Sequence, residues 1–272
     1  AVNGISSEEY ASTLIGLAFI SETGGDYDSS MEYARRALEV NSAIGHVKGK
    51  ATALERIGRI RHLQGEYDEA RANFERALAL VIDHEGPEGL EVAEILIHLA
   101  NLNSNQGRYD LALEEFSRVL EIRRRHFSGD HSLITEVYLG MGSVLLELDR
   151  LDEANTAFEN GLAMNNRLYG EDNNYAFYFV NGLGAVAEER GDLEAASTLY
   201  EKVRRLILRD TPASANLALA TANVGRVTML QGQFEAALKP LQTAMKIFEE
   251  KLPAHWGLGK VKWQLGVCLV ET

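Results

Sequence analysis

The sequence predicts an all-α protein in which six helical hairpins and a final helix stack side by side as an α-solenoid. Three observations lead to this fold class. One phrase, which reads GRYDLALEEFSRVLEIRRRHFSGDH from Gly107 onward, recurs along most of the chain. Apolar residues recur at helical spacing on both sides of its glycine. The composition, with 46% hydrophobic residues and only four prolines among 272 residues, is typical of a folded helical protein.

The phrase has the same residue types at the same places in each copy. Its glycine, or the residue in its place, lies at Gly25, Gly65, Gly107, Asp149, Gly191 and Gly232, at intervals of 40, 42, 42, 42 and 41 residues. Seven residues earlier stands a small residue: Ala18, Gly58, Ala100, Gly142, Gly184 and Gly225. Five residues later stand Ser30, Ala70, Ala112, Ala154, Ala196 and Ala237. Nine residues later stand Ala34, Phe74, Phe116, Phe158, Tyr200 and Leu241, so the first and sixth copies lack the usual aromatic ring.

Each copy is expected to form two helices joined by a tight turn. Around Gly107 the apolar stripes are Leu96, Leu99 and Leu102 on one side and Leu113, Phe116 and Leu120 on the other. The glycine supplies the left-handed conformation that ends the first helix. The small residues let helices approach closely, and the aromatic fills the gap between one hairpin and the next. One hairpin cannot bury its own apolar face, so the hairpins must stack.

These positions resemble the tetratricopeptide repeat (TPR), which has a small residue at its eighth position, glycine near the fifteenth, alanine at the twentieth and an aromatic at the twenty-fourth. The period is longer than the common TPR. With loops such as SGDH (128–131) and YGEDN (169–173), it is more similar to the repeats of kinesin light chains and of bacterial signalling proteins, including tails of Ser/Thr kinases. The resemblance implies a right-handed superhelix whose concave groove is lined by the first helix of each hairpin.

We expect a single array over residues 1–272, without an internal linker. The repeats are expected at approximately 6–45, 46–86, 87–129, 130–171, 172–211 and 212–253, followed by a terminal helix at 254–272. The first helix is expected to begin at Ser6, with Glu9 completing a capping box. Pro87 and Pro212 fall where the third and sixth repeats are expected to start a helix, a favoured place for proline.

The terminal helix has Gly266 at the small position, 41 residues after Gly225. Its expected apolar stripe is Leu258, Val261, Leu265 and Leu269. Two alternatives stay open: a natural cap on the end of the stack, or a sequence cut from a longer array. The modest polarity given by Lys260, Lys262 and Gln264 favours the fragment.

The charges of the phrase have a structural explanation. Acidic residues such as Glu66, Asp68 and Glu69 fall in the first turn of a second helix, and Arg123, Arg124, Arg125 and His126 fall near the last turn of another. Both placements favour the helix dipole, by about 0.3–1 kcal/mol each. No ligand is needed to explain them.

The overall composition excludes several classes of function. The net charge of −13 would repel nucleic acid and anionic membranes. The single cysteine, Cys268, excludes an internal disulfide and a cysteine-based zinc site, fits the reducing cytoplasm, and is expected to be a buried packing residue. No apolar run approaches the ~20 residues that span a bilayer.

The chain holds no motif that predicts catalysis. NGLGAVA (181–187) and LGMGSVL (139–145) contain Gly-x-Gly, but both are expected inside first helices rather than at the strand-to-helix turn that a dinucleotide site requires. HFSGDH (126–131) is interpreted as a loop with a helix-capping aspartate, not as a metal site. Acidic pairs such as Glu114 and Glu115 recur at exposed positions. We therefore expect no catalytic residue, no metal and no cofactor.

The remaining candidate is the groove lining that the TPR resemblance implies. Mapped onto this chain, the candidate groove residues are Glu55, Arg56, Arg59, His62, His98, Asn101, Glu136, Tyr178, Asn181, Asn223, Arg226 and Trp263. Glu94, Ser143, Glu188, Lys260 and Gln264 accompany it. Asn181 and Asn223 match asparagines that kinesin light chains place in their groove. Arg56, Arg59, His98 and Asn101 could hold a carboxylate-bearing peptide; the alternative is that these are ordinary solvated residues paired with neighbouring glutamates.

The sequence thus favours a non-enzymatic scaffold that binds a protein or peptide in its groove, with neither nucleic acid nor membrane as partner. One alternative is a regulatory or sensor segment of a larger signalling protein, such as a bacterial Ser/Thr kinase or a transcription regulator. A third is self-assembly, in which the exposed ends of the stack form a homodimer.

Overall fold

The structure is a computed structural model that describes residues 7–171, 173, 175–210 and 214–272. Over these residues the chain is helical and contains no strand. The helices, in chain order, are α1 (Ser7–Thr23), α2 (Tyr27–Ala43), α3 (Val47–Leu63), α4 (Tyr67–Glu85), α5 (Leu90–Asn105), α6 (Tyr109–His126), α7 (Ser132–Glu147), α8 (Leu151–Tyr169), α9 (Ala176–Glu189), α10 (Leu193–Asp210), α11 (Ala215–Leu230), α12 (Phe234–Lys251) and α13 (Trp256–Glu271).

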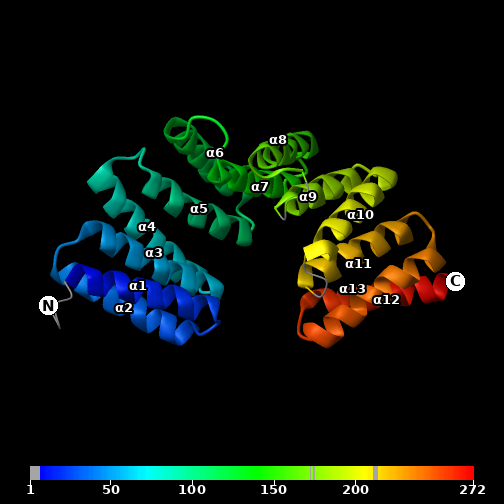
Figure 1. The fold of residues 1–272 in the computed structure, drawn as a ribbon, viewed down its shortest axis with the longest axis horizontal. Coiled ribbons are helices and arrows are strands. Elements are labelled where there is room, and N and C mark those ends of the chain that lie inside the picture. The colour runs from blue at the N-terminus through cyan, green and yellow to red at the C-terminus, as the bar shows by residue number, and fades with distance from the viewer. Residues whose placement is uncertain (1–6, 172, 174, 211–213) are drawn as a thin grey trace. The chain divides into compact units, whose positions relative to one another are not determined.

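The helices pair in chain order as hairpins, beginning with α1 and α2 and ending with α11 and α12, and α13 packs on the last hairpin (Figure 1). The chain forms two compact units, Ala1–Gly129 with α1–α6 and Asp130–Thr272 with α7–α13. Within each unit every hairpin packs on the next one. The all-α solenoid of six hairpins plus a final helix is thereby confirmed. The boundary coincides with the predicted end of the third repeat, and a single continuous array across it stays a prediction.

The turns inside the hairpins have the predicted left-handed residue. Gly65 has φ of 78°, and the N–H groups of Gly65 and Glu66 donate to the carbonyls of His62 and Arg61. This is a Schellman motif, which satisfies two carbonyls at the end of a helix. Asp149 adopts the same geometry with φ of 58°, the only non-glycine residue with positive φ in the described part of the chain.

The small residues of the phrase lie against the bulky residues of the same hairpin. A Cβ atom added at Gly58 would come within 2.7 Å of the Phe74 ring, and one at Gly142 within 2.6 Å of the Phe158 ring. Gly184 faces Tyr200 and Gly225 faces Leu241 in the same way. The Phe158 ring also reaches Gly182 of the next hairpin, as predicted for a residue that fills the gap between hairpins.

The first repeat departs from the others for reasons that the structure shows. Its second helix, α2, ends in a short turn at Gly45, with φ of 69°, where later hairpins have longer connections. The interval is 40 residues in place of 42 mainly because α2 has 17 residues where α4 has 19. Ala34 leaves room that Ile57 and Ile60 of α3 fill.

The basic residues at the end of α6 do more than interact with the helix dipole. Arg123, Arg124, Arg125 and His126 do occupy the last turn. However, the Arg123 side chain is fully buried, and its Nη2 donates to Glu94 Oε1 of α5 over 2.8 Å. Arg125 pairs with Glu88 and Glu121. The predicted place in the last turn is confirmed, and Arg123 in addition reaches across to Glu94 on the neighbouring helix.

Four predictions about helix starts need comment. Ser6 and Pro212 lie outside the described residues. Pro87 does not stand in the first turn of a helix: it lies in the turn that follows Gly86, and α5 begins only at Leu90. The cap of α7 is His131, whose ring nitrogen accepts from the Leu133 N–H, while Asp130 instead binds Arg167.

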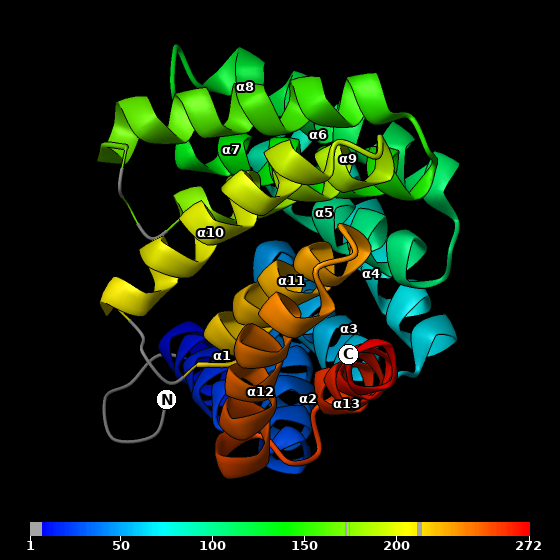
Figure 2. The ribbon, with the colours of Figure 1, turned by 90° about the vertical axis from the view of Figure 1, so that its right-hand side faces the viewer.

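The terminal helix α13 lies beside α12 (Figure 2). Its buried face consists of Gly257, Val261, Gln264, Leu265 and Cys268. The predicted stripe was right for Val261 and Leu265 and wrong for Leu269, which is exposed because it lies about 100° around the helix from Cys268. Gln264, predicted in the groove, is buried.

Candidate functional site

The predicted groove residues all lie on the first helices of their hairpins or on α13. Glu55, Arg56, Arg59 and His62 are on α3, His98 and Asn101 on α5, Glu136 on α7, Tyr178 and Asn181 on α9, Asn223 and Arg226 on α11, and Trp263 on α13. The first six belong to the unit Ala1–Gly129 and the other six to the unit Asp130–Thr272.

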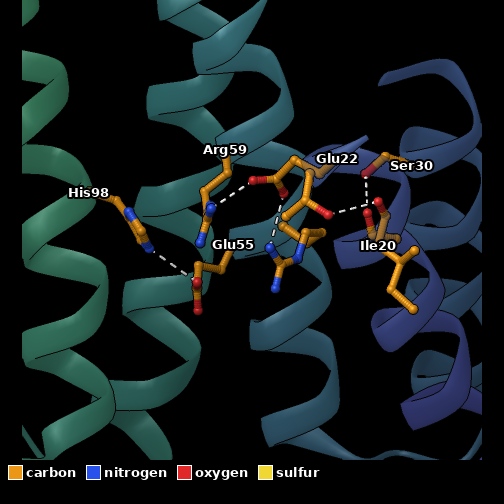
Figure 3. Close-up of polar contacts among 9 residues, drawn as sticks. Ile20, Glu22, Ser30, Glu55, Arg59 and His98 are labelled. Carbon is orange, nitrogen blue, oxygen red and sulfur yellow. Dashed lines mark hydrogen bonds and ion pairs between the residues drawn. The ribbon is translucent and has the colours of Figure 1, made fainter. Parts of the chain in front are cut away.

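In the first unit, both arginines of the predicted set bind one carboxylate. Arg56 Nη1 donates to Glu22 Oε2 over 2.9 Å, and Arg59 Nη2 donates to Glu22 Oε1 over 2.6 Å. Figure 3 shows Arg59 reaching Glu22 from the neighbouring helix. Glu22 stands near the end of α1 and is buried, with 7% of its surface exposed. The carboxylate is therefore satisfied by two cations that come from the next hairpin.

His98 on α5 is paired in the same manner. Its Nε2 lies 3.1 Å from Glu55 Oε1 on α3 (Figure 3). Its ring also stacks on Phe74, with 5.3 Å between the centroids. Burial by itself raises the pKa of the Glu55 carboxyl. The hydrogen bond from His98 and the charges of His98, Arg56 and Arg59 outweigh burial, so that the pKa lies below its usual value. Glu55 is thus held in the charged form.

His62 lies about one helical turn after Arg59 on α3. Its Nε2 is 2.7 Å from the Asn105 amide nitrogen, and its ring meets Tyr67 edge-on. Burial, and then the charge of His98, lower the pKa of this imidazole below its ordinary value. His62 is therefore a neutral acceptor at neutral pH.

These pairs bear on the prediction that Arg56, Arg59 and His98 bind a ligand carboxylate. Arg56, Arg59 and His98 each face a glutamate of an adjacent hairpin, 34 to 43 residues away in the chain. A ligand carboxylate would have to displace Glu22 or Glu55 from them. Asn101 is exposed, with no hydrogen bond to any residue that the structure describes. A carboxylate-binding role for this set stays a prediction, and the internal pairing counts against it.

The second unit repeats this arrangement between α9 and α11. Asn223 Nδ2 donates to Asn181 Oδ1 over 3.2 Å, and Arg226 forms an ion pair with Glu188. The Tyr200 hydroxyl donates to Glu188 Oε2 over 3.0 Å. Burial, and then the nearby charge of Glu189, raise the pKa of the Tyr200 phenol, which stays protonated. The asparagines that match the kinesin light chain pattern are thus bonded to each other.

A cleft opens on this unit beside Tyr178. It has a volume of about 510 Å³ and lies between α7, the end of α8 and the start of α9. We call it the tyrosine cleft; its lining consists of Ser132, Leu133, Thr135, Glu136, Leu139, Tyr169, Tyr175, Tyr178 and Phe179. The predicted residues Glu136 and Tyr178 meet here. The sequence interpretation missed Tyr169 and Tyr175, although Tyr169 begins the expected loop 169–173 and Tyr175 stands two residues after it.

The last helix presents both tryptophans of the chain. Trp256 and Trp263 are 68% and 65% exposed and stand two turns apart on one face of α13. Leu269 and Val270 are exposed as well. Lys262 is engaged with Glu249 of α12 over 2.9 Å. The exposed part of α13 therefore includes four large apolar side chains beside Lys260, Lys262 and Glu271.

The motifs that the sequence interpretation set aside have structural roles. The Gly-x-Gly strings lie inside α7 and α9, where Gly142 and Gly184 pack against rings. Within the described ranges, no three His, Cys, Asp or Glu side chains gather as a metal site would require. In the same part of the chain, no helix combines the length and the apolar character needed to cross a bilayer.

The repeat geometry has a counterpart among known families. A family model described as the MalT-like TPR region matches residues 13–247. The chain belongs to this TPR family. No curated protein matches it.

Solved structures with the same fold include three of different kinds. BtubC (BKLC) from P. vanneervenii is 18% identical, with a TM-score of 0.67 over 92% of this chain and 94% of its own. PilW, a type IV pilus biogenesis factor, is 16% identical, with a TM-score of 0.68 over 92% and 97%. A Signal Transduction ATPase with Numerous Domains (STAND) from Pyrococcus horikoshii, with a TPR sensor, is 14% identical, with a TM-score of 0.71 over 99% of this chain and 40% of its own. At these identities the likeness shows the TPR fold alone.

Proposed function

We propose that this TPR chain is a non-enzymatic scaffold that binds an extended peptide or partner segment on the face of its first helices. The observation that carries the proposal is the tyrosine cleft. It places three exposed tyrosines around a hollow of about 510 Å³ on that face. Tyrosine is enriched where proteins bind one another, because its ring buries apolar area while its hydroxyl stays bonded.

The pairing of the charged groups supports binding rather than catalysis. An acid–base catalyst must present a titratable group to its substrate. On the first helices, Glu22, Glu55 and Glu188 are each bonded to side chains of the protein itself. The charge of −13 and the single, buried Cys268 favour a protein partner in a reducing cytoplasm over nucleic acid or an anionic membrane.

The test is partner capture from a lysate of the source organism with the parent chain and two variants. Tyr178→Ala removes a central ring of the cleft, and Leu111→Ala removes an exposed side chain of α6 as the matched control. A partner kept by the parent and by Leu111→Ala, and lost by a folded Tyr178→Ala, is the expected result. Turnover of a substrate by the isolated chain, with no partner captured by any form, would overturn the proposal.

A second candidate is a sensor segment of a larger signalling protein. The STAND protein with its TPR sensor favours it, since nearly the whole of this chain matches 40% of that one. The expected finding is a gene that encodes a further domain whose activity responds to Tyr178→Ala. An open reading frame for the repeats alone would contradict this candidate.

A third candidate is self-assembly, favoured by the exposed Trp256, Trp263 and Val270 of α13. Contiguous apolar surface of this kind marks interaction sites. Static light scattering over a hundredfold range of concentration would show a mass that rises towards that of a dimer. A constant monomer mass would exclude assembly over that range.

A further inference from the structure

We propose that α13 binds the α13 of a second copy of this chain in an antiparallel pair, in which each tryptophan of one copy lies over a glycine of the other. This inference rests on self-assembly, the third candidate function above, and specifies its surface, its partner and its register. It does not depend on the tyrosine cleft, whose lining contains no residue of α13.

The exposed face of α13 is a regular stripe of tryptophan and glycine. Its members follow one another at spacings of three and four residues, which places them on one side of the helix; we call them the tryptophan stripe, and they are Trp256, Gly259, Trp263, Gly266 and Val270. The two rings are 68% and 65% exposed, and Val270 is 84% exposed. A Cβ atom added at Gly259 or Gly266 would meet nothing within 4 Å. The stripe therefore alternates projecting rings with open backbone.

The same face is covered by a helix in the preceding repeat. The residues that stand 41 positions before the last four members of the stripe lie on α11 and are Ala218, Ala222, Gly225 and Met229. All four are buried. Gly225 packs against Leu241 of α12, and the other three share a core cluster with that residue. A face that takes a neighbouring helix in the sixth repeat is thus exposed on α13.

The tryptophans restrict the kind of helix that can cover this face. The helix α12 lies close to α11 because Ala222 and Gly225 are small, and it presents Leu241 to Gly225. On α13 the residue equivalent to Ala222 is Trp263. A covering helix therefore needs small residues where it crosses the rings, and α13 itself carries glycines between its tryptophans.

The stripe is complementary to itself when it is reversed. From Trp256 to Gly266 the order is Trp, Gly, Trp, Gly at spacings of three, four and three residues, so the reversed stripe has the same spacings with each tryptophan in the place of a glycine. In an antiparallel pair Trp256 lies opposite Gly266 of the second copy, and Trp263 lies opposite Gly259. A twofold axis repeats both contacts. Such an isologous contact uses the same surface on both copies and closes as a dimer.

The rings supply enough surface for a specific contact. The Trp256 ring is already ordered in the single chain, because it stacks on His255 at 5.3 Å, and His255 stacks on Phe248 at 4.9 Å. Less entropy is lost when an ordered side chain binds. A tryptophan buries about 150–250 Å². Four such rings, each covering a similar area of the opposite helix, approach the roughly 1,200 Å² that a specific interface needs.

The charges beside the stripe allow the contact. Lys262 on one side binds Glu249 of α12 over 2.9 Å. Lys260 on the other side has a long stem that lets its ammonium group reach water. Two chains of net charge −13 repel each other at a distance. Association should therefore strengthen as the ionic strength rises from about 0.05 to about 0.5 M, because salt screens this repulsion.

The experiment is sedimentation velocity of the full chain over a wide range of concentration, and we expect an equilibrium between monomer and dimer. Gly266→Leu has open space in the single chain but fills the place of the second copy's Trp256, so it should weaken dimerisation at least about tenfold. Gly16→Leu, at an equally open glycine of α1, is the matched control and should change nothing. Circular dichroism and urea denaturation confirm that each variant is folded.

A compensating pair of substitutions tests the register. Gly259→Trp brings two rings to one place, and Trp263→Ala removes a ring, so each alone should weaken dimerisation at least about tenfold. The double variant should return to within about threefold of the parent, because the introduced ring then meets the small residue at position 263 of the second copy.

The outcomes separate this inference from the functions proposed above. Dimerisation that Gly266→Leu leaves unchanged would overturn the inference, while self-assembly through another surface would stand. Losses that add up in the double variant would overturn the register. A parent that stays monomeric would overturn both the inference and self-assembly. If α13 of a monomeric parent is protected from iodide only by a captured partner, the covering helix belongs to another protein and the inference fails. None of these results changes the test of the tyrosine cleft by Tyr178→Ala.

Discussion

Phe158 is held between two glycines, Gly142 of its own hairpin and Gly182 of the next. A single methyl group at either position would come within 2.6 Å of its ring. At the scale of the residue, the solenoid depends on such positions, where the absence of a side chain lets a ring of another helix approach the backbone. Elsewhere glycine in a helix only lowers stability.

This contrast gives a pair of opposite expectations for the same substitution. Gly16 lies on the exposed face of α1, and an added Cβ would meet nothing within 4 Å. Gly16→Ala should therefore stabilise the protein by up to about 1 kcal/mol through helix propensity. Gly142→Ala gains the same propensity but displaces Phe158, and should destabilise by about 1 kcal/mol overall. Urea denaturation measures both; stabilisation by Gly142→Ala would show that the ring moves without cost.

His62 makes stability depend on pH. Its pKa in the folded chain lies below the ordinary value of 6.5, because of burial and the charge of His98. As the pH falls, the unfolded chain takes up this proton first, so the free energy of unfolding decreases from about pH 6.5 downward. His62→Gln should flatten the dependence between pH 7 and pH 5, whereas His84→Gln, at an exposed position of α4, should not. Parallel curves for the parent and His62→Gln would contradict this.

At the scale of the element, each hairpin turn depends on one left-handed residue, and Asp149 is the exception to glycine. Asp149 forms the same Schellman bonds as Gly65 but carries a side chain that disfavours φ of 58°. Asp149→Gly should stabilise the α7–α8 hairpin by about 0.5–1 kcal/mol. Gly65 occupies the equivalent position in the α3–α4 turn, so the reverse change, Gly65→Asp, should lower stability by a similar amount. A higher urea midpoint for the first variant and a lower one for the second are the expected results.

The docking of α1 on α3 depends on Glu22. Its carboxylate accepts from Arg56 and Arg59, and Arg56 also lies over the Phe19 ring at 5.3 Å. Glu22→Gln should cost about 2 kcal/mol, because a buried acceptor of two charged donors becomes neutral.

The double variant Glu22→Gln with Arg59→Gln provides the control for this interaction. Its loss should be smaller than the sum of the two single losses, since both remove the same bond. Strict additivity in urea denaturation would show that Glu22 and Arg59 do not interact in solution.

The helices and their close contacts could be predicted from the sequence because each depends on residues of one hairpin. Gly58 and Phe74, or Gly142 and Phe158, stand at a constant spacing and recur from repeat to repeat. Helix boundaries that depend on the geometry of a loop were harder to predict from the sequence. Pro87 fits the first turn of a helix by residue type, but the chain makes a further turn before α5 begins.

The candidate site was only partly predictable, because the role of a polar side chain depends on its neighbour in another hairpin. Arg59 donates to Glu22, but the sequence would look the same if Arg59 were free to bind a ligand. Buried Arg123 likewise resembles a solvated helix-end charge until Glu94 is placed beside it. Tyr178 was found because it fits a groove position of the TPR, whereas Tyr169 and Tyr175 lie outside the repeating positions.

At the scale of the whole molecule, charge and aromatic surface are unevenly distributed. Nine of the thirteen net negative charges belong to residues 130–189, and so do the three tyrosines of the cleft. On the first helices of the first unit, cations and anions pair with each other, and Arg226 pairs with Glu188 in the same way in the second unit. The chemistry that could select a partner therefore belongs mainly to the second unit.

The position of the tryptophans has a spectroscopic consequence. The chain has two, Trp256 and Trp263, and both are exposed on α13. Their emission should lie close to that of free tryptophan in water and be readily quenched by iodide. Assembly through α13 would shift the emission to shorter wavelength and protect it from iodide, whereas a peptide in the tyrosine cleft, which has no tryptophan in its lining, would leave it unchanged. Tryptophan emission of the unlabelled protein thus distinguishes self-assembly through α13 from binding of a ligand in the tyrosine cleft.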